Sequence, residues 1–121
     1  MTQLEKQGLA AKQASRVLAI TGSAKKDAAL AAIAAALEAR KDEILQANAA
    51  DMAAAKEAGM RPSLLDRLAL DEKRIAGIVD GVRQVAALPD PIGTVTKMYN
   101  RPNGLTIGKR RVPLGVIGII Y

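Results

Sequence analysis

The charged side chains of this chain, its carboxylates, lysines and arginines, are the first candidates for chemistry. Its 121 residues include no cysteine and no histidine. This excludes a thiolate nucleophile, a histidine general base, a Cys/His zinc site and a disulfide built from this chain alone. We therefore expect no catalytic residue and no metal ligand in it.

Three arginines, Arg67, Arg74 and Arg83, have the charge needed to anchor an anionic substrate. All three fall on helices predicted below, and aspartates stand close to each in the sequence. Arginines on a helix surface are more often held in ordinary ion pairs with such neighbours. We expect ion pairs rather than a substrate site.

A cluster of acids, Glu38, Asp42 and Glu43, could hold a metal ion. However, Arg40 and Lys41 lie between these acids in the sequence. Alternating charges of this kind are typical of a solvated helix surface. We expect such a surface and no metal.

The positive charge of the chain is concentrated near its end. The whole chain has a net charge of +6, and residues 91–121 carry five lysines and arginines and no acid, a net of +5. A basic β-ribbon can enter a DNA groove, but only Tyr99 is available there to stack on bases. We expect a solvated hairpin protected by charge, and no nucleic-acid partner. A basic helical nucleic-acid binder is the less favoured alternative.

The spacing of apolar residues and the turn residues predict four helices. Ser23 and Asp71 are candidate N-caps, and Gly59 is a candidate C-terminal stop. Many of the apolar residues are alanines, which bury little area, so the core should be thin. The longest helix should bend or break around residues 40–48. The predicted helices are 3–20, 24–58, 62–67 and 72–88.

Two β-like runs, 92–99 and 105–112, follow the helices. Asn103-Gly104 lies between them and is a strong hairpin signal. The last residues, 116–121, form a short apolar run typical of a strand buried on both faces of a parallel sheet. Such a strand needs neighbours reached through crossover connections. We therefore expect either a fragment or partner strands supplied by another chain.

Glycines 115 and 118 do not form a phosphate-binding motif. They match neither GxGxxG nor GxxxxGK[ST], and they lie within the predicted strand. We expect them to allow close packing. No segment approaches the roughly 20 apolar residues needed to cross a bilayer, and the N-terminus lacks the apolar run of a secretory signal. The expected location is the cytoplasm, with no membrane partner.

Several blocks of sequence together resemble one family. They are Leu65-Asp-Arg-Leu-Ala-Leu70, Asp90-Pro-Ile-Gly93 and Arg110-Arg-Val-Pro-Leu-Gly-Val-Ile-Gly-Ile-Ile-Tyr121, supported by Ile44-Leu-Gln-Ala-Asn48. In this order they resemble γ-glutamyl phosphate reductase (glutamate-5-semialdehyde dehydrogenase), of the aldehyde dehydrogenase superfamily. The resemblance covers essentially the whole chain, but only the front part of that enzyme.

The resemblance implies an α/β fold of the aldehyde-dehydrogenase type. Residues 1–121 would be the N-terminal part of the cofactor-binding domain. They would comprise its outer helical layer, a β-hairpin arm at 92–112 and the first sheet strand at 116–121. In this superfamily the arm makes subunit contacts, so the resemblance implies a homo-oligomer through residues 92–112. Glutamate 5-kinase is a further candidate partner.

The activity implied by the resemblance is the NADPH-dependent reduction of L-glutamyl 5-phosphate to L-glutamate 5-semialdehyde, a step of proline biosynthesis. Ile119, Ile120 and Tyr121 match the strand end that leads to the nicotinamide side of the cofactor, although a role as sheet core is at least as well supported. The nucleophilic cysteine of the family has no counterpart here. We therefore expect this chain alone to be inactive. The alternative is a non-enzymatic interaction module that docks on complete subunits.

Overall fold

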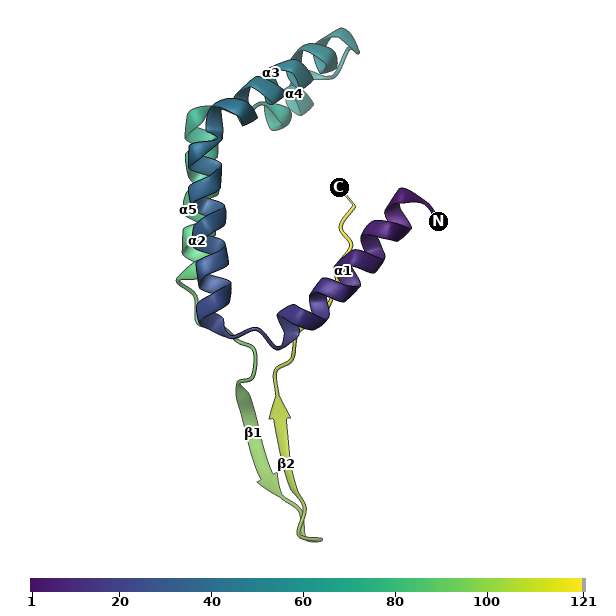
Figure 1. Cartoon of the computed structure of the whole chain (residues 1–121), viewed down its shortest axis with the longest axis vertical. Helices are drawn as coiled ribbons and strands as arrows, with labels where there is room; N and C mark the ends of the chain where they lie inside the picture. Colours follow the sequence, from purple (N-terminus) through teal and green to yellow (C-terminus); the bar gives the residue numbers. More distant parts are fainter. Residues whose placement is uncertain (121) are drawn as a thin grey trace. The chain divides into compact units, whose positions relative to one another are not determined.

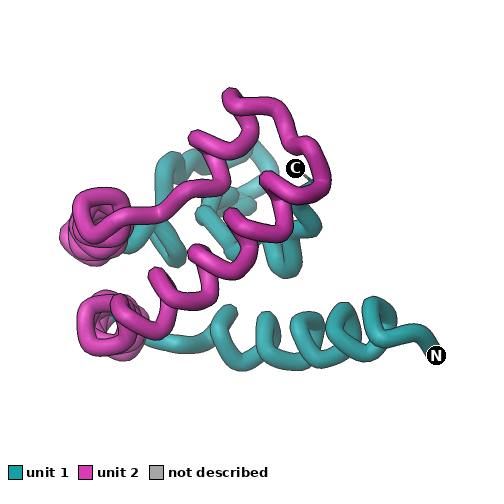
Figure 2. The backbone as a smooth tube through the Cα atoms, turned by 90° about the horizontal axis from the view of Figure 1, so that it is seen from above, with its two compact units in different colours: residues 1–23, 89–121 teal, residues 24–88 magenta. Residues whose placement is uncertain are grey.

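The structure is a computed structural model, and it describes residues 1–120. In this part of the chain five helices precede a two-stranded antiparallel sheet (Figure 1). The chain divides into two compact units, one of residues 24–88 and one of residues 1–23 with 89–121 (Figure 2). The elements are α1 Gln3–Ala19, α2 Ser23–Ala39, α3 Lys41–Glu57, α4 Pro62–Leu68, α5 Glu72–Ala86, β1 Val95–Asn100 and β2 Thr106–Arg110.

The small core of the described residues lies in the unit of residues 24–88. There α2 and α5 lie side by side, as both ribbon views show, and α3 packs against α4 and α5. The buried apolar side chains are Ala34, Ala55, Ile75 and Val79. Two of the four are alanines, so close helix packing replaces the area that larger side chains would bury. The predicted thin core follows from this composition.

The segment expected as one long helix consists of two. α2 ends at Ala39 and α3 begins at Lys41, with Arg40 between them at φ −109° and ψ 19°. Backbone hydrogen bonds reach Arg40 from both sides, from its own N–H to Ala36 O and from Ile44 N–H to its O. The chain therefore changes direction at Arg40, within the range where the sequence placed a bend.

Short polar and glycine signals set the ends of the helices in this unit. Gly59 follows α3 with φ +72°, a conformation that only glycine adopts without strain. Pro62 is the first residue of α4, where its missing N–H costs nothing. The side chain of Asp71 accepts a hydrogen bond from Arg74 N–H at 2.6 Å and caps α5. The predicted roles of Gly59 and Asp71 are confirmed.

In the other unit, α1 begins with a capping box. Thr2 Oγ1 accepts from Glu5 N–H, and Glu5 Oε2 accepts from Thr2 N–H. Ser23 does not have the predicted N-cap role. It is the first residue of α2 rather than the residue before it, and its Oγ donates to Asp90 Oδ2 at 2.9 Å. The serine hydroxyl is thus used for a contact distant in sequence.

The hairpin forms between β1 and β2, with Tyr99 opposite Ile107. An extra residue in β1, Thr96, makes a bulge, since both Val95 and Lys97 have partners in β2 but Thr96 does not. The predicted hairpin is confirmed. In the described chain it follows the five helices.

The turn of the hairpin is closed by hydrogen bonds around Asn103-Gly104. Gly104 N–H donates to Arg101 O at 3.0 Å, and Arg101 N–H donates to Leu105 O at 2.8 Å. Gly104 has φ +85°, and the positive φ angles among residues 1–120 all belong to glycine. This is the three-residue hairpin loop that places glycine in the left-handed region, rather than a two-residue turn centred on Asn-Gly.

Over residues 116–120, the strand predicted at 116–121 is not formed. Residues 111–120 belong to no strand, and residues 112–120 are exposed. A parallel strand is defined by hydrogen bonds to a neighbour, and the hairpin is the whole of the sheet within residues 1–120. The apolar run therefore has no described strand to pair with. Tyr121, the last residue of the predicted strand, lies outside the described residues.

Candidate functional site

The residues expected to contact a cofactor stand at the end of the described chain. Ile119 is 74% exposed and Ile120 is fully exposed. Tyr121 lies outside the described residues. The other described residues therefore leave Ile119 and Ile120 largely uncovered.

The chemistry available in this final segment is limited. Residues 112–120 contain only aliphatic side chains, glycine and proline. They can offer apolar contact and main-chain hydrogen bonds, but no acid, base or nucleophile. Gly115 has φ +91°, a backbone conformation in which a side chain would be strained. The segment could contribute a wall of a site but could not perform the chemistry of one.

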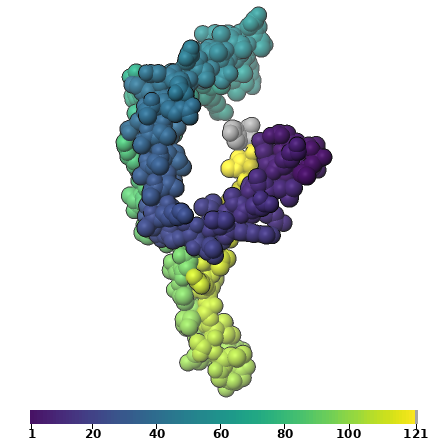
Figure 3. All heavy atoms as spheres, in the orientation of Figure 1, coloured from purple at the N-terminus to yellow at the C-terminus, as the bar shows by residue number. Residues whose placement is uncertain are grey.

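Every residue of the hairpin strands is exposed, so the hairpin offers two exposed faces, and Figure 3 shows the ribbon from one side. One face carries Lys97, Tyr99, Ile107 and Lys109, because cross-strand partners share a face. On this face the Lys97 ammonium lies 5.3 Å from the centre of the Tyr99 ring, within cation–π range. An isolated two-stranded hairpin is marginally stable in water. This face is therefore suited to contact with another surface.

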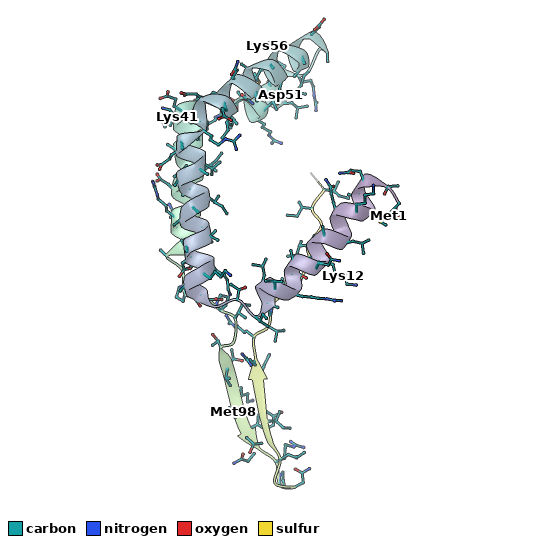
Figure 4. All side chains as sticks on the ribbon, in the orientation of Figure 1. Met1, Lys12, Lys41, Asp51, Lys56 and Met98 are labelled. Atoms are coloured by element: carbon teal, nitrogen blue, oxygen red, sulfur yellow. The ribbon has the colours of Figure 1, made fainter. Side chains whose placement is uncertain are left out.

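On the opposite face of the hairpin, Met98 lies across Gly108 (Figure 4). A Cβ at position 108 would come within 2.6 Å of the Met98 sulfur. The glycine thus leaves room for a flexible side chain to lie across the ribbon. Asn100 and Thr106 follow on this face, joined by a hydrogen bond from Thr106 Oγ1 to Asn100 Oδ1 at 2.8 Å.

The arginines considered as substrate anchors include two that hold the helices together. Arg74 pairs with Asp66 at 2.8 Å and also donates to the main-chain carbonyls of Asp66 and Ala69. It thereby satisfies carbonyl groups at the C-terminal end of α4. Arg83 pairs with Glu38 at 2.9 Å and so links α5 to α2. Arg67 lines a shallow depression beside Arg74.

Two of the three acids considered as metal ligands, Glu38 and Glu43, are used in ion pairs. Arg40 bonds Glu43 at 2.7 Å, and this hydrogen bond lowers the pKa of Glu43 and raises the pKa of Arg40. Glu38 is paired with Arg83. Among residues 1–120 no group of three or more potential metal ligands is present. This agrees with the solvated charged surface expected from the sequence.

A groove in the unit of residues 24–88 lies between α5 and the junction of α2 with α3. Its rim carries Glu38, Lys41 and Glu72, and its floor contains Ile75 and Val79. Lys41 Nζ lies 3.3 Å from Glu72 Oε1 and closes part of the rim. Lys41 and Glu72 pair with each other and Glu38 pairs with Arg83, so the charged groups of the rim are all held in ion pairs.

Asn48, the buried polar side chain of the described residues, had no role predicted from the sequence. Its Nδ2 donates to Leu68 O at 2.8 Å, and its Oδ1 accepts from Leu70 N–H at 2.8 Å. It is 9% exposed and holds the link between α4 and α5 from α3. The signal in the sequence was a polar residue four positions after Ile44 in an apolar helical stripe. That spacing places Asn48 on the face of α3 that packs inward.

Within residues 1–120, no helix combines the length and the apolar character that a membrane span requires.

Comparisons with known proteins give a consistent result. No protein-family model matches the chain. The chain is 56% identical over 119 residues to "Gamma-glutamyl phosphate reductase" of Moorella thermoacetica, and 53% identical over 121 residues to the protein of that name in Lachnospira eligens. These matches cover 98% and 100% of this chain, but only 28% and 29% of the relatives.

Two solved structures have the same arrangement of elements. The γ-glutamyl phosphate reductase of Thermotoga maritima matches with a TM-score of 0.87 at 38% identity, and that of Saccharomyces cerevisiae with 0.86 at 32%. Each match covers 93% of this chain, and 27% and 29% of those chains. More than half of the aligned residues are identical along the whole chain, and the structures agree. Both comparisons therefore point to the same family. The chain belongs to the γ-glutamyl phosphate reductase family and corresponds to an N-terminal part of its aldehyde-dehydrogenase-like fold.

Proposed function

We propose that the chain forms part of an oxidoreductase that converts L-glutamyl 5-phosphate to L-glutamate 5-semialdehyde with NADPH and releases phosphate, in proline biosynthesis. The observation that carries this proposal is the 56% identity to a γ-glutamyl phosphate reductase over 98% of the chain. The chain spans less than a third of the relatives it matches. The chemistry itself is therefore assigned to residues beyond those of this chain.

The proposed share of this chain in the active site is positional. The reaction requires a nucleophile to displace phosphate from the acyl group, and this chain has no cysteine to supply one. NADPH, when bound, supplies the hydride. Residues 112–120 carry no charge, so they suit contact with an uncharged part of the dinucleotide rather than its phosphates. We assign this contact to Ile119, Ile120 and Tyr121.

The chain alone should show no reductase activity, whereas a chimera should be active. In the chimera, residues 1–121 replace the matching segment of the complete Moorella thermoacetica enzyme, from which this chain differs at under half of the aligned positions. The measurement is NADPH formation from NADP, glutamate 5-semialdehyde and phosphate. The expected rate is within about tenfold of the parent, since residues of this chain contribute contacts and no acid, base or nucleophile.

The parent enzyme with the same segment deleted is the negative control. Activity of the isolated chain would overturn its proposed inactivity. A chimera that folds, binds NADPH and yet fails to reduce NADP would overturn the proposed family function for these residues.

We further propose that the chain assembles with copies of itself through the hairpin arm at 92–112. The supporting observation is the exposed face carrying Tyr99 and Ile107, on a ribbon that is marginally stable when unpartnered. Ile107→Lys should shift the light-scattering mass toward the monomer. It should raise the concentration needed for assembly by about tenfold, because a charge would be buried at the contact.

The matched control is Thr106→Lys, which places the same charge one residue earlier, on the opposite face. It should leave the assembly nearly unchanged. Equal loss of assembly in both variants would show that the Tyr99 and Ile107 face is not the contact. A monomer at every concentration would contradict the proposed assembly.

The same face also supports a second candidate function, a non-enzymatic interaction module. The observation that favours it is that every residue of β1 and β2 is exposed. Co-purification of the chain with an intact reductase subunit would support this function. Glutamate 5-kinase is a further proposed partner, because its acyl phosphate product is the substrate of the proposed reduction.

A further inference from the structure

We propose that Asn103 is a site of spontaneous deamidation, because among the asparagines of the chain it alone combines an exposed position in a loop with a following glycine. The backbone nitrogen of Gly104 attacks the side-chain carbonyl carbon of Asn103. A nitrogen–carbon bond forms, the bond from that carbon to Nδ2 breaks, and ammonia leaves. Water then opens the cyclic imide to give aspartate or isoaspartate. One water is consumed, one ammonia is released, and no oxidant or reductant is needed.

Asn103 and Gly104 lie in the turn of the hairpin, and the Asn103 side chain is folded toward the backbone that follows it. Asn103 Oδ1 accepts a hydrogen bond from Leu105 N–H at 3.3 Å. This bond folds the side chain back over the backbone that follows it, which is the side where Gly104 N lies. It also polarises the carbonyl group that is attacked. Asn103 Oδ1 is thereby kept near the backbone that follows it, and ring closure becomes possible when the turn opens.

Gly104 leaves the attack unobstructed. A Cβ at this position would have no atom within 4 Å, so the turn is open to water, and the glycine itself presents no side chain to the incoming carbonyl carbon. One contact opposes the reaction, since Gly104 N–H donates to Arg101 O at 3.0 Å. This bond must open before the nitrogen can attack. Because the bond lies in an exposed loop, it should open far more often than one in the core.

The other two asparagines of the chain are internal controls. Asn48 is buried, and both its Oδ1 and its Nδ2 are hydrogen bonded. Asn100 is exposed, but its Oδ1 is bonded to Thr106 Oγ1, and the next residue is Arg101 rather than glycine. Neither combines an accessible side chain with a following glycine.

The reaction would alter the hairpin in two ways. Aspartate or isoaspartate adds a negative charge to the segment 91–121, which has five cations and no acid. Isoaspartate also adds one backbone atom between Asn103 and Gly104. The closing bond from Gly104 N–H to Arg101 O depends on the present spacing, so the turn should weaken.

The test is to incubate the purified 121-residue chain at mildly alkaline pH in ¹⁸O-labelled water. Peptide mapping by mass spectrometry would then follow label uptake at each asparagine. Uptake at Asn103 should exceed that at Asn100 by about tenfold or more, because only Asn103 precedes glycine. Labelling by an isoaspartyl methyltransferase should identify the isoaspartate product.

Two controls make the outcome decisive. Asn103→Gln keeps a side-chain amide but lengthens it by one carbon, so uptake at position 103 should fall to the level of Asn100. The urea-unfolded chain shows the rate without the turn. If the folded chain gains no more label at Asn103 than at Asn100, the proposal is overturned, whether or not the unfolded chain reacts.

Discussion

Replacing Asn48 with leucine should lower the free energy of unfolding of the unit of residues 24–88 by about 3 kcal/mol. Both halves of its amide are used, one on Leu68 O and one on Leu70 N–H. A leucine is branched at Cγ like asparagine, although it is larger, and it bonds neither group. A carbonyl and an N–H near the core would then lose their partners, which is the costly form of losing a hydrogen bond. Urea unfolding followed by far-ultraviolet circular dichroism measures the change.

The control for this prediction is Gln46→Ala. Gln46 is an exposed amide on the same helix, two residues away. Its loss should change the unfolding free energy by no more than about 0.5 kcal/mol. If Asn48→Leu unfolds the chain before urea is added, the lost helical signal reports the same effect. Equal stability of Asn48→Leu and Gln46→Ala would show that the two hydrogen bonds do not hold the link between α4 and α5.

The second large effect is expected at Val79, which is only 1% exposed and is the largest fully buried side chain among the described residues. Val79→Ala removes two methyl groups from a core that contains few large side chains. The free energy of unfolding should fall by about 2 kcal/mol, from lost burial and from the cavity that remains. The midpoint of urea unfolding should fall while its slope stays the same.

Val85→Ala is the matched control, because it is the same substitution on the same helix at a residue that is 55% exposed. It should change the unfolding free energy by about 0.5 kcal/mol or less. The two variants have the same change in helix propensity, so their difference isolates burial. Comparable decreases in the free energy of unfolding in both variants would contradict the assignment of Val79 as the centre of the core.

Local signals in the sequence were sufficient for most of the helices and for the hairpin. Asp71 and Gly59 act through bonds within a few residues, so their roles could be predicted from residue type and position alone. The hairpin was predicted for the same reason. Its turn depends on one glycine at positive φ, and Asn103-Gly104 marked the place.

Contacts between distant residues could not be predicted in this way. The hydroxyl of Ser23 was expected to cap a helix, but it bonds Asp90, 67 residues further along the chain. Asn48 likewise bonds residues 20 and 22 positions away. A polar side chain in a helix has several possible partners, and its residue type does not identify which one it meets.

The candidate site illustrates a different limit. The apolar run at 116–121 was predicted as a strand because of its side chains, but strand formation depends on a neighbour. Within the described part of the chain, no strand pairs with residues 116–120. The role of Ile119 and Ile120 therefore depends on surfaces outside these residues. Resemblance, rather than local pattern, identified the cofactor as their expected neighbour.

The hydrogen bond between Ser23 and Asp90 has a topological consequence. It brings the chain at the entry to the segment 24–88 within bonding distance of the chain at its exit. The segment therefore has the form of an insertion, with its two ends close together. Domains with adjacent ends are the kind that tolerate circular permutation and transplantation. The sequence of this segment can therefore lengthen, shorten or diverge while the entry and exit points remain in place.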